Sequence, residues 1–198
     1  MTRLPESFYR ADDVVKIARD LLGKTLVTRI SGNVTAAMIT ETEAYHQSEK
    51  ACHAYNGRRT ARTEILFHQG GCCYVYLCYG IHNLFNVVTG KRGEAAAVLI
   101  RAAQPVVGRQ LMMDRRALKK PGPRISAGPG NLSQALGLTL AHNKTSLVNE
   151  GNIWIESGEE VSQDLVRATN RIGVDYAQED ASLPWRFYVL GNQWISKP

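Results

Sequence analysis

The sequence predicts an α+β fold: a single domain over residues 1–198 with a mostly antiparallel, curved β-sheet, flanking helices and a protruding β-hairpin. Two observations favour this fold. Strand-like segments follow one another across short turns, as in antiparallel sheets, and the regular alternation of strand and helix typical of a parallel sheet is missing. The length of 198 residues suits one domain, because a chain of this size buries about 70% of its unfolded surface.

The first expected element is an amphipathic helix over residues 11–24. Its apolar side chains recur every three or four residues, and Gly23 ends the pattern. Strands are expected over residues 25–30 and 34–44, joined by a Ser-Gly-Asn turn. These two strands predict a hairpin.

The remaining elements are strands with few helices between them. Strands are expected over residues 73–79, 83–88, 95–101, 153–156, 172–176 and 185–190. The first two of these pair across Gly80. Helices are expected over residues 105–120, stopped by a Pro-Gly-Pro sequence, and over residues 131–136.

Composition and charge limit the classes of protein and of binding partner that fit this sequence. Hydrophobic residues at 44% and charged residues at 21% exclude wholesale disorder and fibrous architectures. The 24 basic residues exceed the 18 acidic ones by 6, which favours a polyanionic partner. We expect neither a signal peptide nor a membrane span, and therefore a cytoplasmic protein, nucleoid-associated if the source is bacterial.

Four cysteines, Cys52, Cys72, Cys73 and Cys78, lie close together without any CxxC pair. This spacing predicts reduced thiols that fill a core, no metal site and no cofactor. A site that combines a cysteine with His53 or His68 stays open as an alternative.

Reactive and aromatic residues concentrate in one stretch of the chain. Residues 45–86 hold five of the eight tyrosines, four of the five histidines and all four cysteines. Tyr74 and Tyr76 alternate onto one face of their strand. They indicate either a tyrosine-rich sheet core or platforms on which nucleobases stack.

The ETEAY sequence places Glu41, Glu43 and Tyr45 on one face of a strand. A solvated sheet face is one interpretation of this pattern. The apolar residues 36–39 before it indicate that the strand starts in the core, and a carboxylate at the end of a buried strand is a candidate general base.

Several motifs together carry a family resemblance. ETEAY, His53, GRRTAR, YVYLCYG with Asn86, VLIRA, GPGNLSQALGL and the pair RIGV and RFYV follow one another in this order. The chain thereby resembles the alkyladenine (3-methyladenine) DNA glycosylases. The resemblance implies a monofunctional enzyme of base-excision repair that flips alkylated or deaminated purines out of duplex DNA and hydrolyses the N-glycosidic bond without a metal.

The resemblance also assigns roles to residues. It implies that Glu43 is the general base, that Arg101 and the main-chain carbonyl of Ile172 hold the nucleophilic water, that Tyr45, Tyr76 and His53 stack on the flipped base, that Asn86 discriminates against guanine, and that Tyr79 wedges into the duplex. From the residues alone, Arg101 is equally a buried ion-pair partner.

Basic residues predict a surface for the DNA backbone. Residues 101–125 carry a net charge of +6, from seven basic residues and one acid. We expect a phosphate-binding stripe formed by Arg58, Arg59, Arg62, Arg115, Arg116, Lys119 and Lys120. A solvated helix face is the alternative. The Gly-Pro-Gly-Asn segment at 128–131 predicts either one phosphate site or plain helix capping.

Two other functions are compatible with parts of the sequence. A non-catalytic nucleic-acid-binding module would use the tyrosines and the basic residues but not Glu43. A glycoside hydrolase would use Glu41 and Glu43 as a carboxylate pair. The leading hypothesis is the DNA glycosylase, acting as a monomer on double-stranded DNA that contains damaged purines.

Overall fold

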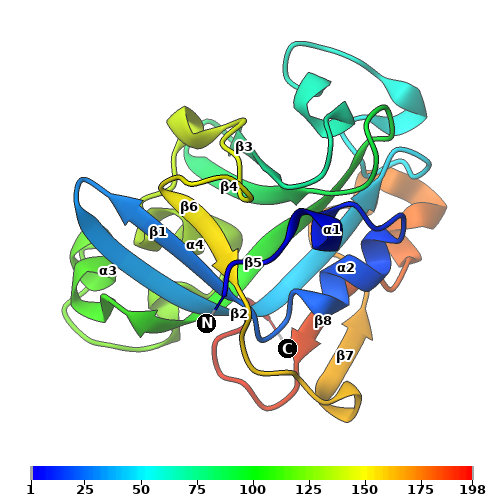
Figure 1. The fold of residues 1–198 in the computed structure, drawn as a ribbon. Helices are drawn as coiled ribbons and strands as arrows, with labels where there is room; N and C mark the ends of the chain where they lie inside the picture. The colour runs from blue at the N-terminus through cyan, green and yellow to red at the C-terminus, as the bar shows by residue number, and fades with distance from the viewer. Residues whose placement is uncertain (1, 198) are drawn as a thin grey trace.

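The structure, a computed structural model, describes residues 2–197 and confirms the α+β prediction. Eight strands form one sheet in which every pairing is antiparallel (Figure 1). The strands are β1 (Thr25–Ile30), β2 (Asn33–His46), β3 (Cys72–Cys78), β4 (His82–Val88), β5 (Ala96–Val107), β6 (Ile153–Glu156), β7 (Val166–Thr169) and β8 (Arg186–Val189). The α-helices are α1 (Glu6–Tyr9), α2 (Val14–Asp20), α3 (Arg109–Arg115) and α4 (Pro129–Leu136).

The long strands β2 and β5 form the centre of the sheet. The strand order is β3-β4-β5-β2-β1-β6, and β8 pairs with both β2 and β7. The pairing of β2 with β5 shifts register on both sides of Glu41, which leaves Thr40 and Arg101 without a partner in the ladder. Such bulges bend strands and redirect side chains, often beside functional sites.

Two helix predictions need correction. The helix expected over residues 11–24 is shorter, because α2 begins at Val14 after Asp13 caps it through the main-chain N–H of Lys16, at 2.9 Å. The helix expected over residues 105–120 starts too early. Pro105 still belongs to β5 and pairs with Ala37 of β2. The chain turns into α3 only at Gly108, which has a φ of 74°. Continued pairing with β2 thus overrides the local helix signal.

The strand expected over residues 172–176 is wrong. This segment is a loop that enters a 3-10 helix over Asp175–Ser182. The strand that pairs with β8 at this edge of the sheet is β7. Gly173 has a φ of 76°, a left-handed conformation that interrupts an extended strand. The strands expected over residues 95–101 and 34–44 are longer than predicted, whereas β1 and β6 match their predictions.

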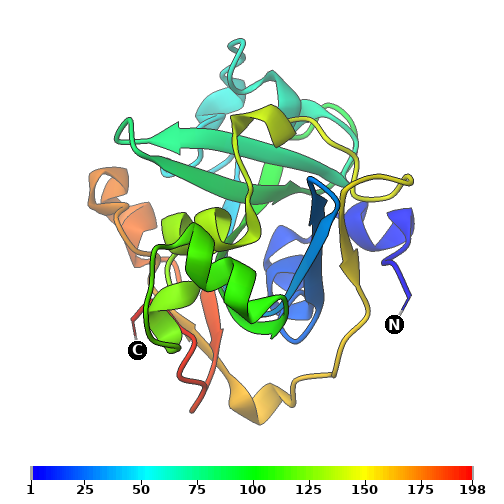
Figure 2. The same cartoon turned by 90° about the vertical axis from the view of Figure 1, so that its left-hand side faces the viewer.

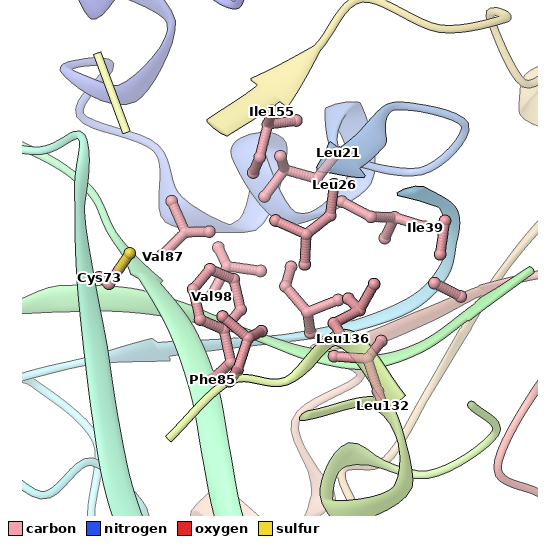
Figure 3. Close-up of a cluster of buried hydrophobic side chains, with 14 of the residues drawn as sticks. Leu21, Leu26, Ile39, Cys73, Phe85, Val87, Val98, Leu132, Leu136 and Ile155 are labelled. Atoms are coloured by element: carbon pink, nitrogen blue, oxygen red, sulfur yellow. The ribbon is translucent and has the colours of Figure 1, made fainter. Parts of the chain in front are cut away.

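The main hydrophobic core joins two helices to the sheet (Figure 3). Leu21, which directly follows α2, and Leu132 from α4 belong to the same buried cluster as Leu26, Phe85 and Val98 from three strands. A smaller cluster contains Cys52, Leu66 and Tyr74 beneath the loop that follows β2. The two clusters hold β3, β4 and β5 from both sides.

The β3–β4 hairpin protrudes from the rest of the molecule (Figure 2). Tyr79 and Gly80 form its turn with φ values of 51° and 73°, and the Ile81 N–H donates to the Cys78 carbonyl at 3.1 Å. Tyr79 is 88% exposed, so the prediction of an aromatic side chain at an exposed hairpin tip is confirmed. A core position for Tyr79 is excluded.

Among the described residues, no helix has both the length and the apolar character needed to cross a membrane.

Burial predicts effects of very different size on stability for two aromatic truncations on the β3–β4 hairpin. Phe85→Ala should lower the free energy of unfolding by about 3–5 kcal/mol, because Phe85 is fully buried and leaves a cavity. Tyr79→Ala should change it by no more than about 0.5 kcal/mol. Urea denaturation of both variants measures the difference, and a comparable loss in Tyr79→Ala would contradict the exposed tip.

Candidate active site

A cavity of about 620 Å³ opens between the β3–β4 hairpin, the end of β2, the start of α4 and the loops around residues 51–62 and 172–176. Its volume lies in the range of small-molecule binding sites. Seven aromatic side chains line its wall, namely Tyr45, His53, Tyr74, Tyr76, Tyr79, His82 and Tyr176. The cavity is therefore suited to a flat, aromatic ligand.

Glu43 lies in β2 directly behind this wall, and its side chain is fully buried. Its Oε1 accepts the main-chain N–H of Ile172 at 2.8 Å. Its Oε2 accepts the hydroxyl of Tyr45 at 2.8 Å and an N–H of Arg101 at 3.1 Å. All three donors belong to residues that line the cavity, so the carboxylate lies directly behind the cavity wall.

Arg101 links two carboxylates, as the interpretation of a buried ion-pair partner predicts. Its Nη1 binds Glu43 and its Nε binds Glu41 at 2.9 Å. Glu41 also accepts Arg186 at 2.7 Å and the hydroxyl of Ser196 at 2.7 Å. Burial acts to lower the pKa of Arg101, but the charges of Glu43 and Glu41 outweigh it and raise that pKa.

Glu41 is not available for chemistry in the cavity. Both of its oxygens are held by Arg101, Arg186 and Ser196, and its side chain has no exposed surface. The two glutamates are thus brought together as expected, but only Glu43 is bonded to residues of the cavity wall other than Arg101.

Tyr45 is fixed from two sides. On one side its hydroxyl donates to Glu43. On the other, the guanidinium of Arg171 lies 4.7 Å from the ring centroid and forms a buried ion pair with Glu49 at 2.8 Å. Burial, followed by the negative charge of Glu43, raises the pKa of Tyr45 well above its ordinary value, so the phenol keeps its proton and acts as the donor.

The sequence analysis missed the Arg171–Glu49 pair. Arg171 also donates to the carbonyl of Ala44 at 2.9 Å and so ties the loop that carries Ile172 to the end of β2. The two partners are 122 residues apart, and no local pattern links them.

Tyr74, Tyr76 and His53 form a packed aromatic group. The rings of Tyr74 and Tyr76 are stacked with centroids 5.3 Å apart, and His53 meets Tyr76 edge to face at 4.7 Å. Tyr74 is 2% exposed and belongs to the smaller core cluster, as expected for at least one tyrosine of this strand. Tyr76 and His53 border the cavity more openly.

Arg62 is exposed and lies against this aromatic group. Its guanidinium lies 4.9 Å from the Tyr76 centroid and donates to the Tyr74 hydroxyl at 3.2 Å. Burial, and then the charge of Arg62, lowers the pKa of His53 to about 4, so the imidazole is neutral near neutral pH.

Asn86 in β4 is 4% exposed and lines the cavity. Its Nδ2 donates to the carbonyls of Tyr74 at 3.1 Å and Leu84 at 3.4 Å. Because both partners are acceptors, they fix which end of the amide is the nitrogen. The side chain is therefore held in one orientation.

Apart from Arg62, the basic residues expected to contact DNA fall into two groups. Arg59 pairs with Glu64, Arg115 donates to the carbonyl of Ala135, and Arg116 donates to Gln134. These three arginines therefore use part of their hydrogen-bonding capacity in contacts within the protein. Arg58, Lys119 and Lys120 are exposed and enter no ion pair within the described part of the chain.

Cysteine thiols contribute to the core and to the cavity wall. All four are free, Cys73 lies in the main core, and Cys52 and Cys78 border the cavity. Burial raises the pKa of Cys52 to about 12, which keeps it a protonated thiol. Over residues 2–197, no group of three or more His, Cys, Asp or Glu side chains is arranged to hold a metal ion.

Comparison with known proteins agrees with the resemblance. The family model described as "Methylpurine-DNA glycosylase" matches residues 7–193. A protein of Chlamydia felis named "Putative 3-methyladenine DNA glycosylase" is 48% identical over 188 residues, covering 94% of this chain and 95% of the relative. Proteins with the same name from Methanocella arvoryzae and Carboxydothermus hydrogenoformans are 44% and 43% identical, and the alignments cover 97% or more of each chain. This chain belongs to the methylpurine-DNA glycosylase family, a family of hydrolases that act on alkylated purines in DNA.

Proposed function

We propose that this enzyme flips alkylated or deaminated purines out of duplex DNA into the cavity of about 620 Å³ and hydrolyses the N-glycosidic bond with a water that Glu43 activates. The observation that carries this proposal is the buried Glu43 carboxylate, bonded to three residues of an aromatic cavity wall. The enzyme would act as a monomer in base-excision repair, in the cytoplasm.

The cavity wall favours an alkylated purine through the charge of the base. Tyr45, Tyr76 and His53 present aromatic rings, and an alkylated purine that carries a positive charge is attracted to the faces of such rings. A neutral His53 supports this binding, since an imidazolium would repel the cationic base.

The proposed reaction is a hydrolytic displacement at the sugar. A water held near Glu43 and Arg101 attacks C1′, and its proton passes to the Glu43 carboxylate as the new C–O bond forms. The C1′–N bond breaks, and its electron pair leaves with the base. A cationic base departs as a neutral molecule and needs no prior protonation. No lysine lines the described cavity, which favours water over an amine as the nucleophile.

The resemblance assigns the carbonyl of Ile172 to this water. In the structure the N–H of the same residue holds Glu43 at 2.8 Å, which supports a role for this loop in orienting the base. Asn86, whose amide is held by two carbonyls, would discriminate against guanine by steric exclusion of its exocyclic amino group.

The two rival functions have less support. A glycoside hydrolase needs a second carboxylate in the cleft, and Glu41 is enclosed by two arginines and Ser196. A non-catalytic binding module has no use for a carboxylate buried behind the ligand site.

Substitution of Glu43 tests the proposed base. Glu43→Gln should slow single-turnover excision of an alkylated purine by about 10²–10⁴-fold, because the amide cannot accept the proton from water. Duplex binding should stay close to that of the wild type. Excision at near wild-type rate would exclude Glu43 as the base.

Glu41→Gln is the matched control for that variant. It weakens the contacts of two buried arginines, so its main effect should be a lower melting temperature rather than a lower rate constant in the molecules that remain folded. Equal losses of rate in the two variants would instead indicate a carboxylate pair.

The lowered pKa of His53 predicts a contribution to the pH dependence of stability. With a folded pKa of about 4 against an ordinary value of 6.5, the unfolded chain binds more protons between these values. The stabilising contribution of the neutral His53 is therefore complete above pH 6.5 and is lost as the pH falls toward 4. His53→Asn should therefore lose less stability than the wild type between pH 7 and pH 4.5, measured by urea denaturation. An equal loss in both proteins would contradict the lowered pKa.

Tyr79 is the proposed wedge at the hairpin tip. Because a wedge contributes only when a base leaves a paired stack, Tyr79→Ala should lower excision from duplex DNA by at least about tenfold and excision from single strands far less. The ratio of duplex to single-strand rates is the measurement. An unchanged ratio would place the wedge elsewhere, with Ile81, 72% exposed, as the next candidate.

A further inference from the structure

The first turn of α4 lies against the β3–β4 hairpin close to its tip. His82 of β4 and Gly130 of α4 both border the cavity. A Cβ atom on Gly130 would lie 2.9 Å from both Cγ and Nδ1 of the His82 ring and 3.2 Å from the His82 Cβ. Carbon atoms in contact lie about 3.5–4.0 Å apart. The His82 ring therefore packs on the main chain of α4, in space that a side chain at residue 130 would fill.

The close approach of His82 explains why residue 130 is a glycine. Gly130 is the second residue of α4 and is not among the glycines with a positive φ, so other residues can adopt its conformation. Glycine is less favourable than alanine in a helix, because it loses more conformational freedom on folding. Local preference therefore favours alanine at this position, and the contact with His82 is what requires glycine.

The start of α4 is a firm support for this contact. Pro129 restricts the main chain at the first helical position, and the Nδ2 of Asn131 donates to the Ala127 carbonyl at 2.8 Å. Leu132 is fully buried in the main core. The first turn of the helix is thus fixed by the core, and it can hold the hairpin in turn.

Beyond His82 the hairpin extends away from the body of the protein (Figure 2). Tyr79 and Ile81 are 88% and 72% exposed, and His82 pairs with Cys78 at the last position of the ladder. Tyr79 has a φ of 51°, a left-handed conformation that residues other than glycine rarely adopt. The ladder and the turn fix the direction of Tyr79 relative to His82. The position of His82 therefore sets the position of Tyr79.

We propose that His82 and Gly130 are positioning residues for the wedge: their contact holds the β3–β4 hairpin against α4 and so sets where Tyr79 enters the duplex. The inference rests on the proposed function, which makes Tyr79 the wedge. The flipped base and the gap that it leaves in the stack belong to one nucleotide, so the wedge must lie at a fixed distance from the cavity. A rigid support meets this requirement before DNA binds, which reduces the cost of ordering the hairpin on DNA.

Gly130→Ala tests the contact. Its added methyl group displaces His82 and with it the hairpin, so kcat/KM on a duplex with one central 3-methyladenine should fall by about tenfold. The kcat/KM on the same damaged strand alone should fall far less, because a single strand needs no wedge. A purely structural contact would lower the melting temperature and leave the ratio of the two kcat/KM values unchanged, and that result would overturn the inference.

Gly151→Ala is the matched control. It makes the same substitution at an exposed glycine, where the atoms nearest to an added Cβ are 3.9 Å away. The ratio of duplex to single-strand kcat/KM should equal that of the wild type. A loss as large as that of Gly130→Ala would contradict a specific contact with His82.

Two double variants assign the effect to the contact and to the wedge. In a His82→Ala protein the added methyl group has room, so Gly130→Ala should cause no further loss in the ratio. In a Tyr79→Ala protein it should again cause no further loss, because the wedge that it displaces is absent. A further loss of more than about twofold in either background would overturn the inference.

These results separate the inference from the proposed function. If Tyr79→Ala lowers the ratio but Gly130→Ala does not, Tyr79 is the wedge and the contact with α4 does not position it. If Tyr79→Ala leaves the ratio unchanged, the proposed wedge is wrong. Wild-type enzyme that releases no purine from the duplex contradicts the proposed function as a whole.

Discussion

The buried charge cluster around Arg101 is the interaction on which the rest of the site depends. Two carboxylates, Glu41 and Glu43, and two guanidiniums, Arg101 and Arg186, lie together with exposed fractions of 6% or less. Removing charges from water costs several kcal/mol per ion, and the cost is offset only where geometry and hydrogen bonding are good. The double bulge between β2 and β5 supplies that geometry, because it turns Arg101 out of the regular ladder and onto both glutamates.

Because of this cluster, the wall behind the cavity depends on contacts between distant parts of the chain. Glu43 is held by Arg101 from β5 and by the N–H of Ile172 from a loop near the C-terminus. Tyr45 is held between Glu43 and the Arg171–Glu49 pair. Four segments of the chain therefore meet behind one cavity, and their ion pairs limit how far the wall can move. Tyr79, at the hairpin tip, and Tyr176, in the loop that follows Ile172, line the cavity but are exposed and take no part in these ion pairs.

The sequence predicts the antiparallel sheet well and the site in part. Alternating apolar residues and the Gly80 turn were sufficient for the β3–β4 hairpin, and the spacing of Glu43 and Tyr45 predicted their shared face, because these signals are local. The start of the helix expected at Pro105 was wrong, because pairing with β2 extends β5 to Val107. The strand expected over residues 172–176 was wrong, because Gly173 has a left-handed conformation and a 3-10 helix follows it. The Arg171–Glu49 pair could not be predicted, because its partners are 122 residues apart and carry no local pattern.

The central claim is that Glu43 holds and deprotonates the water that attacks the sugar. A crystal structure of the enzyme with a duplex whose damaged nucleotide carries a 2′-fluorine, which slows glycosidic cleavage, tests it most directly. The account predicts the damaged base between Tyr45, Tyr76 and His53 and an ordered water within about 3.2 Å of a Glu43 oxygen, facing C1′. A flipped base in the cavity with Glu43 still sealed from it, and no water between the carboxylate and C1′, would contradict the account.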